Sequence, residues 1–292
     1  MFIRLKKNKK KFISVLLVIF LLFLITLKNK DNSSKKFESS KYLNELTIDK
    51  DDYNLFLLGY KNFNEKLNLK NSISKGILPR VAHAGGGFNN QIYTNSIEAL
   101  ESNKNYYLFF EIDFFLTGDN YLVCEHDFGD HLKTLKKFNE FAKKKKSYTP
   151  CTYKTLKNWL LKNPDKIIIT DFKNRNIEGL IFISKNFKNF KDQFIPQIFH
   201  PKEYNKVKNL GYKNIIWTLY RYDKSNDSVL LFSNKMKLFA ITMNPARARS
   251  GLAKLLKKKN IKTYVHTINN IKDYYRYIKL YKVDQIYTDW IK

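Results

Sequence analysis

The chain has 292 residues, of which 43% are hydrophobic and 27% charged, so it is long enough and apolar enough for one large domain with a substantial core. Its 54 basic side chains against 26 acidic ones leave a formal net charge of +28, which favours an anionic partner. Two cysteines exclude the dense disulfide framework of a small secreted domain.

The first segment in chain order is predicted to be a membrane anchor. A basic cluster in residues 1–11 precedes an uncharged run, residues 12–27. At about 1.5 Å per residue this run falls a little short of a hydrocarbon core about 30 Å thick, but flanking lysines can snorkel to the surface. We expect a cytoplasmic tail (1–11) and a single-pass transmembrane signal anchor (12–27), with the rest periplasmic or extracellular. A cleaved signal peptide or a buried terminal helix is the alternative, although no small-x-small cleavage site follows Leu27.

Residues 28–77 are predicted to be a tether and a helical lead-in to the main domain. Residues 31–40 are polar, and apolar side chains then recur at helical spacing between residues 41 and 75. We expect one or two helices there, packed on the side or base of the domain that follows.

From residue 78 to residue 292, short apolar runs alternate with longer amphipathic stretches, which is typical of βαβ units and a parallel sheet. We predict eight strands: 80–83, 108–113, 166–171, 194–199, 214–219, 238–243, 262–267 and 285–288. Because eight such units close a barrel, the predicted fold is α/β, a (β/α)8 TIM barrel in a single domain.

Polar residues with metal and proton chemistry follow the first strands. His83 opens into three glycines, and Glu111 and Asp113 lie two residues apart, so both carboxylates leave the same strand face and can hold one hard cation. A turn at residues 117–120 then reverses the chain and delivers His126 back toward the acids. In a barrel of this kind the active residues lie at the carboxyl ends of the strands, where these side chains fall.

The order of these motifs resembles the glycerophosphodiester phosphodiesterase family of the PLC-like phosphodiesterase superfamily. The matching segments are His83-Ala84-Gly85, Thr94-Asn95-Ser96, Glu111-Ile112-Asp113, Thr117-Gly118-Asp119, His126-Asp127 and Asp171-Phe172-Lys173. The resemblance covers residues 78–292 and implies a barrel that hydrolyses phosphodiesters. Three positions depart from the family pattern: Ala84 replaces an arginine, Thr94 a glutamate, and Asp171 is one methylene shorter than the usual glutamate.

The resemblance and the residue chemistry together give a site prediction. Glu111, Asp113 and Asp171 are expected to bind a divalent cation, Ca²⁺ or Mg²⁺, because every ligand is an oxygen. His83 and His126 are the expected catalytic acid and base, since the pKa of histidine lies near neutrality.

Four more residues are predicted to bind substrate: Lys173, Arg221, Trp217 and His266. Lys173 shares a strand face with Asp171 and is expected to meet a phosphate oxygen. Arg221 is the first candidate to replace the missing arginine, with Arg247 and Arg249 as the second. Asn95 and Glu98 fit a capping box, which makes Glu98 a helix cap rather than a ligand.

Partners and cysteine state leave alternatives open. The basic charge favours an anionic membrane surface or an anionic phosphodiester polymer, or else reflects the amino-acid composition of an AT-rich genome. No recognisable nucleic-acid motif accompanies it, so no nucleic-acid partner is expected. We expect Cys124 and Cys151 to be unpaired buried thiols, with a bridge between them as the alternative. The competing function is a catalytically impaired barrel that serves as a binding or assembly module at the envelope.

Overall fold

The structure is a computed structural model that describes residues 78–146 and 148–292. The strands are β1 (Val81–Ala82), β2 (Phe109–Leu116), β3 (Leu122–Cys124), β4 (Ile167–Phe172), β5 (Phe194–Ile198), β6 (Ile216–Thr218), β7 (Ala240–Met243), β8 (Thr263–Val265) and β9 (Gln285–Thr288). The α-helices are α5 (Ile97–Asn103), α6 (Leu135–Phe141), α7 (Tyr153–Lys162), α8 (Asn176–Asn186), α9 (Tyr204–Asn209), α10 (Asn226–Ser233), α11 (Pro245–Arg249), α12 (Leu252–Lys258) and α13 (Ile271–Lys279). Short 3₁₀ or π segments are η2 (His83–Gly85), η3 (Asp130–Leu132), η4 (Ala142–Lys146), η5 (Lys188–Gln193) and η6 (Pro201–Glu203).

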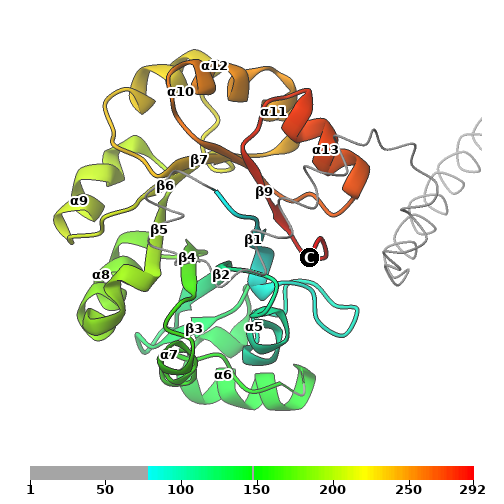
Figure 1. Cartoon of the computed structure of the whole chain (residues 1–292). Helices are drawn as coiled ribbons and strands as arrows, with labels where there is room; N and C mark the ends of the chain where they lie inside the picture. Colours follow the sequence, from blue (N-terminus) through cyan, green and yellow to red (C-terminus); the bar gives the residue numbers. More distant parts are fainter. Residues whose placement is uncertain (1–77, 147) are drawn as a thin grey trace, which may run out of the picture. The chain divides into compact units, whose positions relative to one another are not determined.

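The sheet closes on itself. The strand order is β1-β9-β8-β7-β6-β5-β4-β2-β3, and β1 also pairs with β2, so every strand except β3 belongs to a closed ring of eight. All ring pairings are parallel, whereas β3 is antiparallel to β2 at the edge. Helices surround the ring, and β1 (cyan) meets β9 (red) at its seam (Figure 1). The predicted (β/α)8 barrel is confirmed.

The eight predicted strands correspond one to one with β1, β2 and β4 to β9. The last has the predicted bounds, Gln285–Thr288, and the others differ by one to three residues at an end. The predicted turn at residues 117–120 and the hairpin after it also form, with Phe114 opposite Cys124. Apolar alternation and turn residues therefore suffice to locate these strands.

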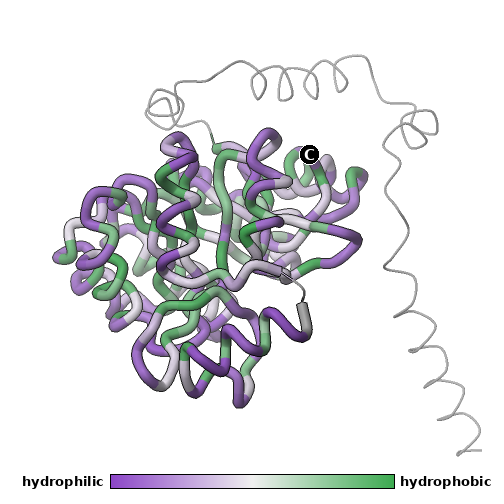
Figure 2. Tube along the Cα trace, turned by 90° about the horizontal axis from the view of Figure 1, so that it is seen from below, coloured by the Kyte–Doolittle hydropathy of each residue, from purple (hydrophilic) through white to green (hydrophobic). Residues whose placement is uncertain are grey.

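Strand parity separates two apolar layers. Phe109 on β2 and Ile167 and Ile169 on β4 belong to a cluster inside the barrel, whereas the intervening side chains pack outward against the helices. Hydrophilic residues gather on the outer helices (Figure 2). Toward the carboxyl ends of β2 and β4, the inner face carries Glu111, Asp113 and Asp171 in place of apolar residues. The three acids therefore lie next to the apolar interior of the barrel.

The two cysteines form a disulfide, and the prediction of unpaired thiols is wrong. The amide of Cys124 donates to the carbonyl oxygen of Cys151 at 2.8 Å, and Val123 forms a β-bridge with Thr152. This pairing places the segment before α7 alongside β3, and the two Cα atoms are 5.2 Å apart. The bridge joins the hairpin that carries His126 to the body of the barrel.

Some predictions lie outside the described residues: the tail (1–11), the anchor (12–27), and the tether and lead-in (28–77). Within the part of the chain that the structure describes, there is no helix whose length and apolarity would let it cross a membrane.

Candidate active site

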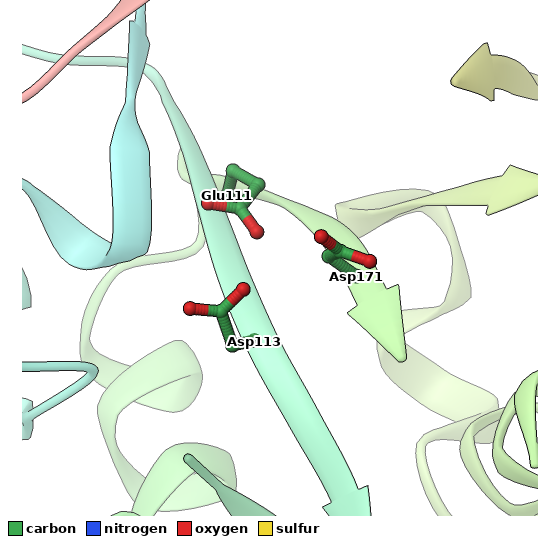
Figure 3. A group of neighbouring side chains, drawn as sticks. All are labelled: Glu111, Asp113 and Asp171. Carbon is green, nitrogen blue, oxygen red and sulfur yellow. The ribbon is translucent and has the colours of Figure 1, made fainter. Parts of the chain in front are cut away.

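Three carboxylates meet at the carboxyl ends of two neighbouring strands. Glu111 and Asp113 project from β2, Asp171 projects from β4, and Asp113 and Asp171 are direct partners in the strand register. One oxygen of each lies within 4.8 Å of the others, and all three residues are buried. Figure 3 shows the carboxylates turned toward one another. An all-oxygen group of this kind is suited to a hard divalent cation.

The carboxylates repel one another in a medium that solvates them poorly. Burial and the charge of Asp113 raise the pKa of Glu111 well above its usual value. Burial pushes the pKa of Asp113 in the same direction, but the ammonium of Lys173 and the imidazole of His83 outweigh it and hold that pKa low. Oε1 of Glu111 is buried and, among the described residues, has no hydrogen-bond partner. A positive charge placed among the three carboxylates would therefore stabilise their ionised form.

Lys173 supplies part of that charge. Its Nζ lies 2.6 Å from Oδ1 of Asp113 and 2.9 Å from Oδ2 of Asp171. Burial disfavours the ammonium, yet the charges of Asp171, Asp113 and Glu111 raise its pKa. The residue predicted to meet a phosphate oxygen thus lies within the acid cluster and forms ion pairs with two of its members.

Ala84 and Asn95 hold the acids by hydrogen bonds. The backbone N–H of Ala84 donates to Oε2 of Glu111 at 2.8 Å. Asn95 donates from Nδ2 to Oδ2 of Asp113 at 2.8 Å and accepts at Oδ1 from the Asp113 amide at 2.9 Å. The predicted capping box is wrong, because Ser96 caps α5 and Oε1 of Glu98 accepts from the Thr149 amide instead.

His83 lies beside the acids in a charged, largely buried environment. Its Nδ1 is 2.9 Å from Oδ1 of Asp289, and its Nε2 is 4.0 Å from Oε2 of Glu111. Burial alone would lower the pKa of His83, but the hydrogen bond to Asp289 and the charges of Glu111, Asp289 and Asp113 raise it from 6.5 to about 9. Asp289 is itself fixed by Asn269, whose Nδ2 donates to Oδ2 at 2.6 Å.

His126 approaches the site from the hairpin, and Tyr93 lies between the two histidines. The Tyr93 ring centroid is 4.8 Å from that of His83 and 4.4 Å from that of His126. Because these distances sum to 9.2 Å, the two imidazoles lie no farther apart than that. His126 is more exposed than His83, and its Nδ1 contacts Oδ1 of Asp127 at 2.7 Å.

Tyr220, Arg221 and His266 form another side of the mouth. The hydroxyl of Tyr220 donates to Oδ1 of Asp171 at 2.7 Å. The Arg221 guanidinium lies 4.0 Å from the ring centroid of Phe199 and 5.1 Å from that of Tyr220, without an ion pair to a described acid. The His266 ring lies 6.0 Å from that of Tyr220, and burial and the charges of His83 and Lys173 lower its pKa to about 3. Both predicted residues therefore lie near the cluster.

Trp217 does not line the site, and the prediction that it binds substrate is wrong. Its side chain is fully buried in the layer between barrel and helices, and its Nε1 donates to the carbonyl oxygen of Phe199 at 3.2 Å. The neighbouring Ile216 occupies the inner face of β6, so strand parity turns Trp217 outward. Arg247 and Arg249 are also occupied elsewhere, by loop carbonyls and by the hydroxyl of Tyr277.

The site contains residues that the sequence did not single out: Asp289, Tyr93 and Tyr220. Asp289 directly follows β9, so its position at a strand end was an available signal. No sequence signal marked Tyr93 or Tyr220, because tyrosines are common in loops. Their contacts with the site are made with residues distant in sequence. Of the predicted site residues, Trp217, Arg247 and Arg249 are engaged elsewhere, whereas the others gather at one mouth of the barrel.

Comparison with solved structures gives the same fold. A glycerophosphodiester phosphodiesterase from Parabacteroides distasonis is 18% identical over 72% of this chain and 92% of its own, with a TM-score of 0.58. A putative glycerophosphoryl diester phosphodiesterase from Agrobacterium tumefaciens is 11% identical over 73% and 94%, with a TM-score of 0.59. An Oleispira antarctica phosphodiesterase in complex with the product sn-glycerol-3-phosphate is 14% identical over 75% and 95%, with a TM-score of 0.57. No family model and no curated protein matches the sequence. At these identities the likeness establishes the fold.

Proposed function

We propose that this chain is a divergent glycerophosphodiester phosphodiesterase that hydrolyses a phosphodiester with the help of a bound divalent cation. The observation that carries the proposal is the convergence of Glu111, Asp113 and Asp171 beside His83 at the carboxyl end of the barrel. Active residues of such barrels lie at this end. The fold that the chain shares with solved phosphodiesterases supports the proposal by analogy.

The residues present fit a cation. Three buried carboxylates that repel one another are the arrangement that a divalent ion would stabilise, and Oε1 of Glu111 has no hydrogen-bond partner within residues 78–146 and 148–292. Ca²⁺ or Mg²⁺ suits ligands that are all oxygen. When bound, such an ion neutralises charge that develops on the non-bridging phosphate oxygens.

The chain's own groups account for proton transfer and orientation. Of His83 and His126, one accepts the proton of the attacking water or hydroxyl and the other returns a proton to the leaving alkoxide. Asp289 fixes the imidazole of His83 through Nδ1 and leaves Nε2 facing the site. Lys173 provides positive charge for the phosphate, and Arg221 provides more in place of the arginine that Ala84 replaces.

The substrate class follows from the same chemistry: a glycerophosphodiester, a phospholipid headgroup or a phosphodiester-linked surface glycan. We propose that residues 12–27 anchor the chain, with residues 1–11 cytoplasmic and the barrel outside the membrane near anionic lipid. The disulfide between Cys124 and Cys151 supports this placement, because disulfides persist in oxidising compartments. The net charge of +28 supports proximity to an anionic membrane surface.

Turnover assays separate an enzyme from an impaired barrel. Purified protein is incubated with bis-nitrophenyl phosphate and with glycerophosphodiesters, with added Ca²⁺ or Mg²⁺ or with EDTA. We expect metal-dependent product release from the wild type and a loss of at least a hundredfold in Asp113→Asn, with the exposed Asp165→Asn as the matched control. Absence of metal-dependent release from every substrate would favour the binding module.

A further inference from the structure

A groove with apolar walls lies beside the turn of the β2–β3 hairpin. Its volume is about 340 Å³, which is within the range of small-molecule sites. Its lining includes Phe115, Leu116, Phe128 and Leu132, with the exposed cations Lys133 and Arg175 at its edge. Phe128 is 72% exposed although its ring contacts Phe115, with the centroids 4.6 Å apart. The exposed ring of Phe128 therefore adds accessible apolar surface to the wall of the groove.

The groove adjoins the proposed active site along three separate segments. Phe115 shares the inner strand face with Asp113, about 7 Å farther along β2. Asn174 directly follows Lys173, whose ammonium contacts two of the acids. Phe128 lies two residues beyond His126. A substrate whose phosphate reaches the acids therefore has one of its two ester arms beside this groove.

Hydrogen bonds hold the groove walls in place. Asn174 accepts from the amide of Leu116 and donates to its carbonyl oxygen, each at 3.0 Å. Arg175 donates to the carbonyl oxygens of Leu116 and Thr117. The amide of Gly118 donates to the carbonyl oxygen of Leu132 at 3.0 Å, and a Cβ on this glycine would meet the Lys133 carbonyl at 2.6 Å. The groove is thus preformed by tight packing between the hairpin turn and the segment after it.

We propose that this groove binds an alkyl or acyl chain carried by one alcohol of the phosphodiester substrate. The proposal rests on the proposed function and narrows it from any phosphodiester to one with an apolar arm. In an amphiphilic phosphodiester, a few bonds join the phosphate to a hydrocarbon chain. The phosphate would bind at the acid cluster while the chain contacts the apolar walls of the groove. A water-soluble glycerophosphodiester or a glycan would leave these walls unused.

Binding of octyl phosphate and methyl phosphate, measured by isothermal titration calorimetry, tests the proposal without relying on turnover. The two ligands share the phosphate and differ only in chain length, and octyl phosphate is kept below the concentration at which it forms micelles. We expect the wild type to bind octyl phosphate at least about tenfold more tightly than methyl phosphate. In Phe128→Ser the ratio should fall toward one. The control Leu161→Ser, at a leucine of α7 that is 61% exposed, should keep the wild-type ratio.

Equal binding of both phosphates by the wild type, or an unchanged ratio in Phe128→Ser, would overturn the proposal. The alternative occupant of the groove is a second copy of this chain, and sedimentation tests it by measuring the oligomeric state. If Phe128→Ser converts a dimer to a monomer and the wild type shows no preference for octyl phosphate, the groove is an interface between two copies and the proposal fails. Turnover of bis-nitrophenyl phosphate, which has no alkyl chain, judges the proposed function separately. Metal-dependent turnover without a preference for octyl phosphate would contradict only the proposal that the groove binds an alkyl chain. A preference for octyl phosphate without turnover would contradict only the proposed catalytic activity.

Discussion

The contact between His83 and Asp289 is expected to be a pH-dependent source of stability in the metal-free protein. The imidazole is largely buried, and the neighbouring carboxylates raise the pKa of His83 from 6.5 to about 9, which corresponds to about 3 kcal/mol in favour of the protonated form. Because the folded-state pKa is the higher one, this stabilisation is complete below pH 6.5 and is lost as the pH rises through about 9.

Asp289→Asn removes the nearest of these charges while keeping the side-chain volume. We expect the pKa of His83 to fall, and the free energy of unfolding at pH 6 to drop by about 1.5–3 kcal/mol, the usual range for a hydrogen bond to a charged group. The difference between wild type and variant should shrink as the pH rises through about 9.

Two measurements check this prediction in protein treated with a chelator. Imidazole resonances followed by NMR report the pKa of His83, and urea denaturation at several pH values reports the free energy of unfolding. Asp273→Asn is the control, since the Asp273 side chain is partly exposed and forms an ion pair with the nearby Arg276 at 3.1 Å. A His83 pKa that is the same in Asp289→Asn, or a stability difference that does not vary with pH, would refute the reasoning.

Three further predictions concern the metal, the tyrosine between the two histidines and the disulfide. Ca²⁺ or Mg²⁺ at a hundredfold excess over its dissociation constant should stabilise the wild type by about 2.7 kcal/mol in thermal unfolding, and Asp171→Asn should lose this gain while Asp165→Asn keeps it. Tyr93→Phe should keep turnover within about threefold if the ring acts by packing between the histidines, whereas Tyr93→Ala should lose at least about tenfold; equal effects would contradict a packing role. The double substitution of Cys124 and Cys151 by serine should destabilise the fold by about 2–4 kcal/mol in urea, and an unchanged midpoint would mean that the bridge does not form in solution.

The barrel was predictable from sequence because its strands are short apolar runs that end in polar residues. Each run supplies a buried strand, and the acids near the carboxyl ends of β2 and β4, Asp113 and Asp171, mark the edge where the site forms. The same periodicity puts Glu111 and Asp113 on one face. Local pattern therefore gave the pair Glu111 and Asp113, and the resemblance to the phosphodiesterase family added Asp171.

Strand parity and long-range pairing were not predictable in the same way. Trp217 lies next to residues of the site in sequence, but the parity of β6 turns it toward the helices. Asn95 has the chemistry of a helix cap, yet Asp113 takes its side chain and leaves Ser96 to cap the helix. The disulfide depends on a pairing between β3 and the segment before α7, which no local pattern indicates.

The most direct test of the proposed chemistry is anomalous scattering from crystals soaked in Mn²⁺, which takes oxygen ligands like those of Mg²⁺. We predict a peak among the carboxylates of Glu111, Asp113 and Asp171 that is absent in Asp113→Asn. A peak elsewhere with none at these acids, or three carboxylates that point away from one another, would contradict a cation-assisted mechanism.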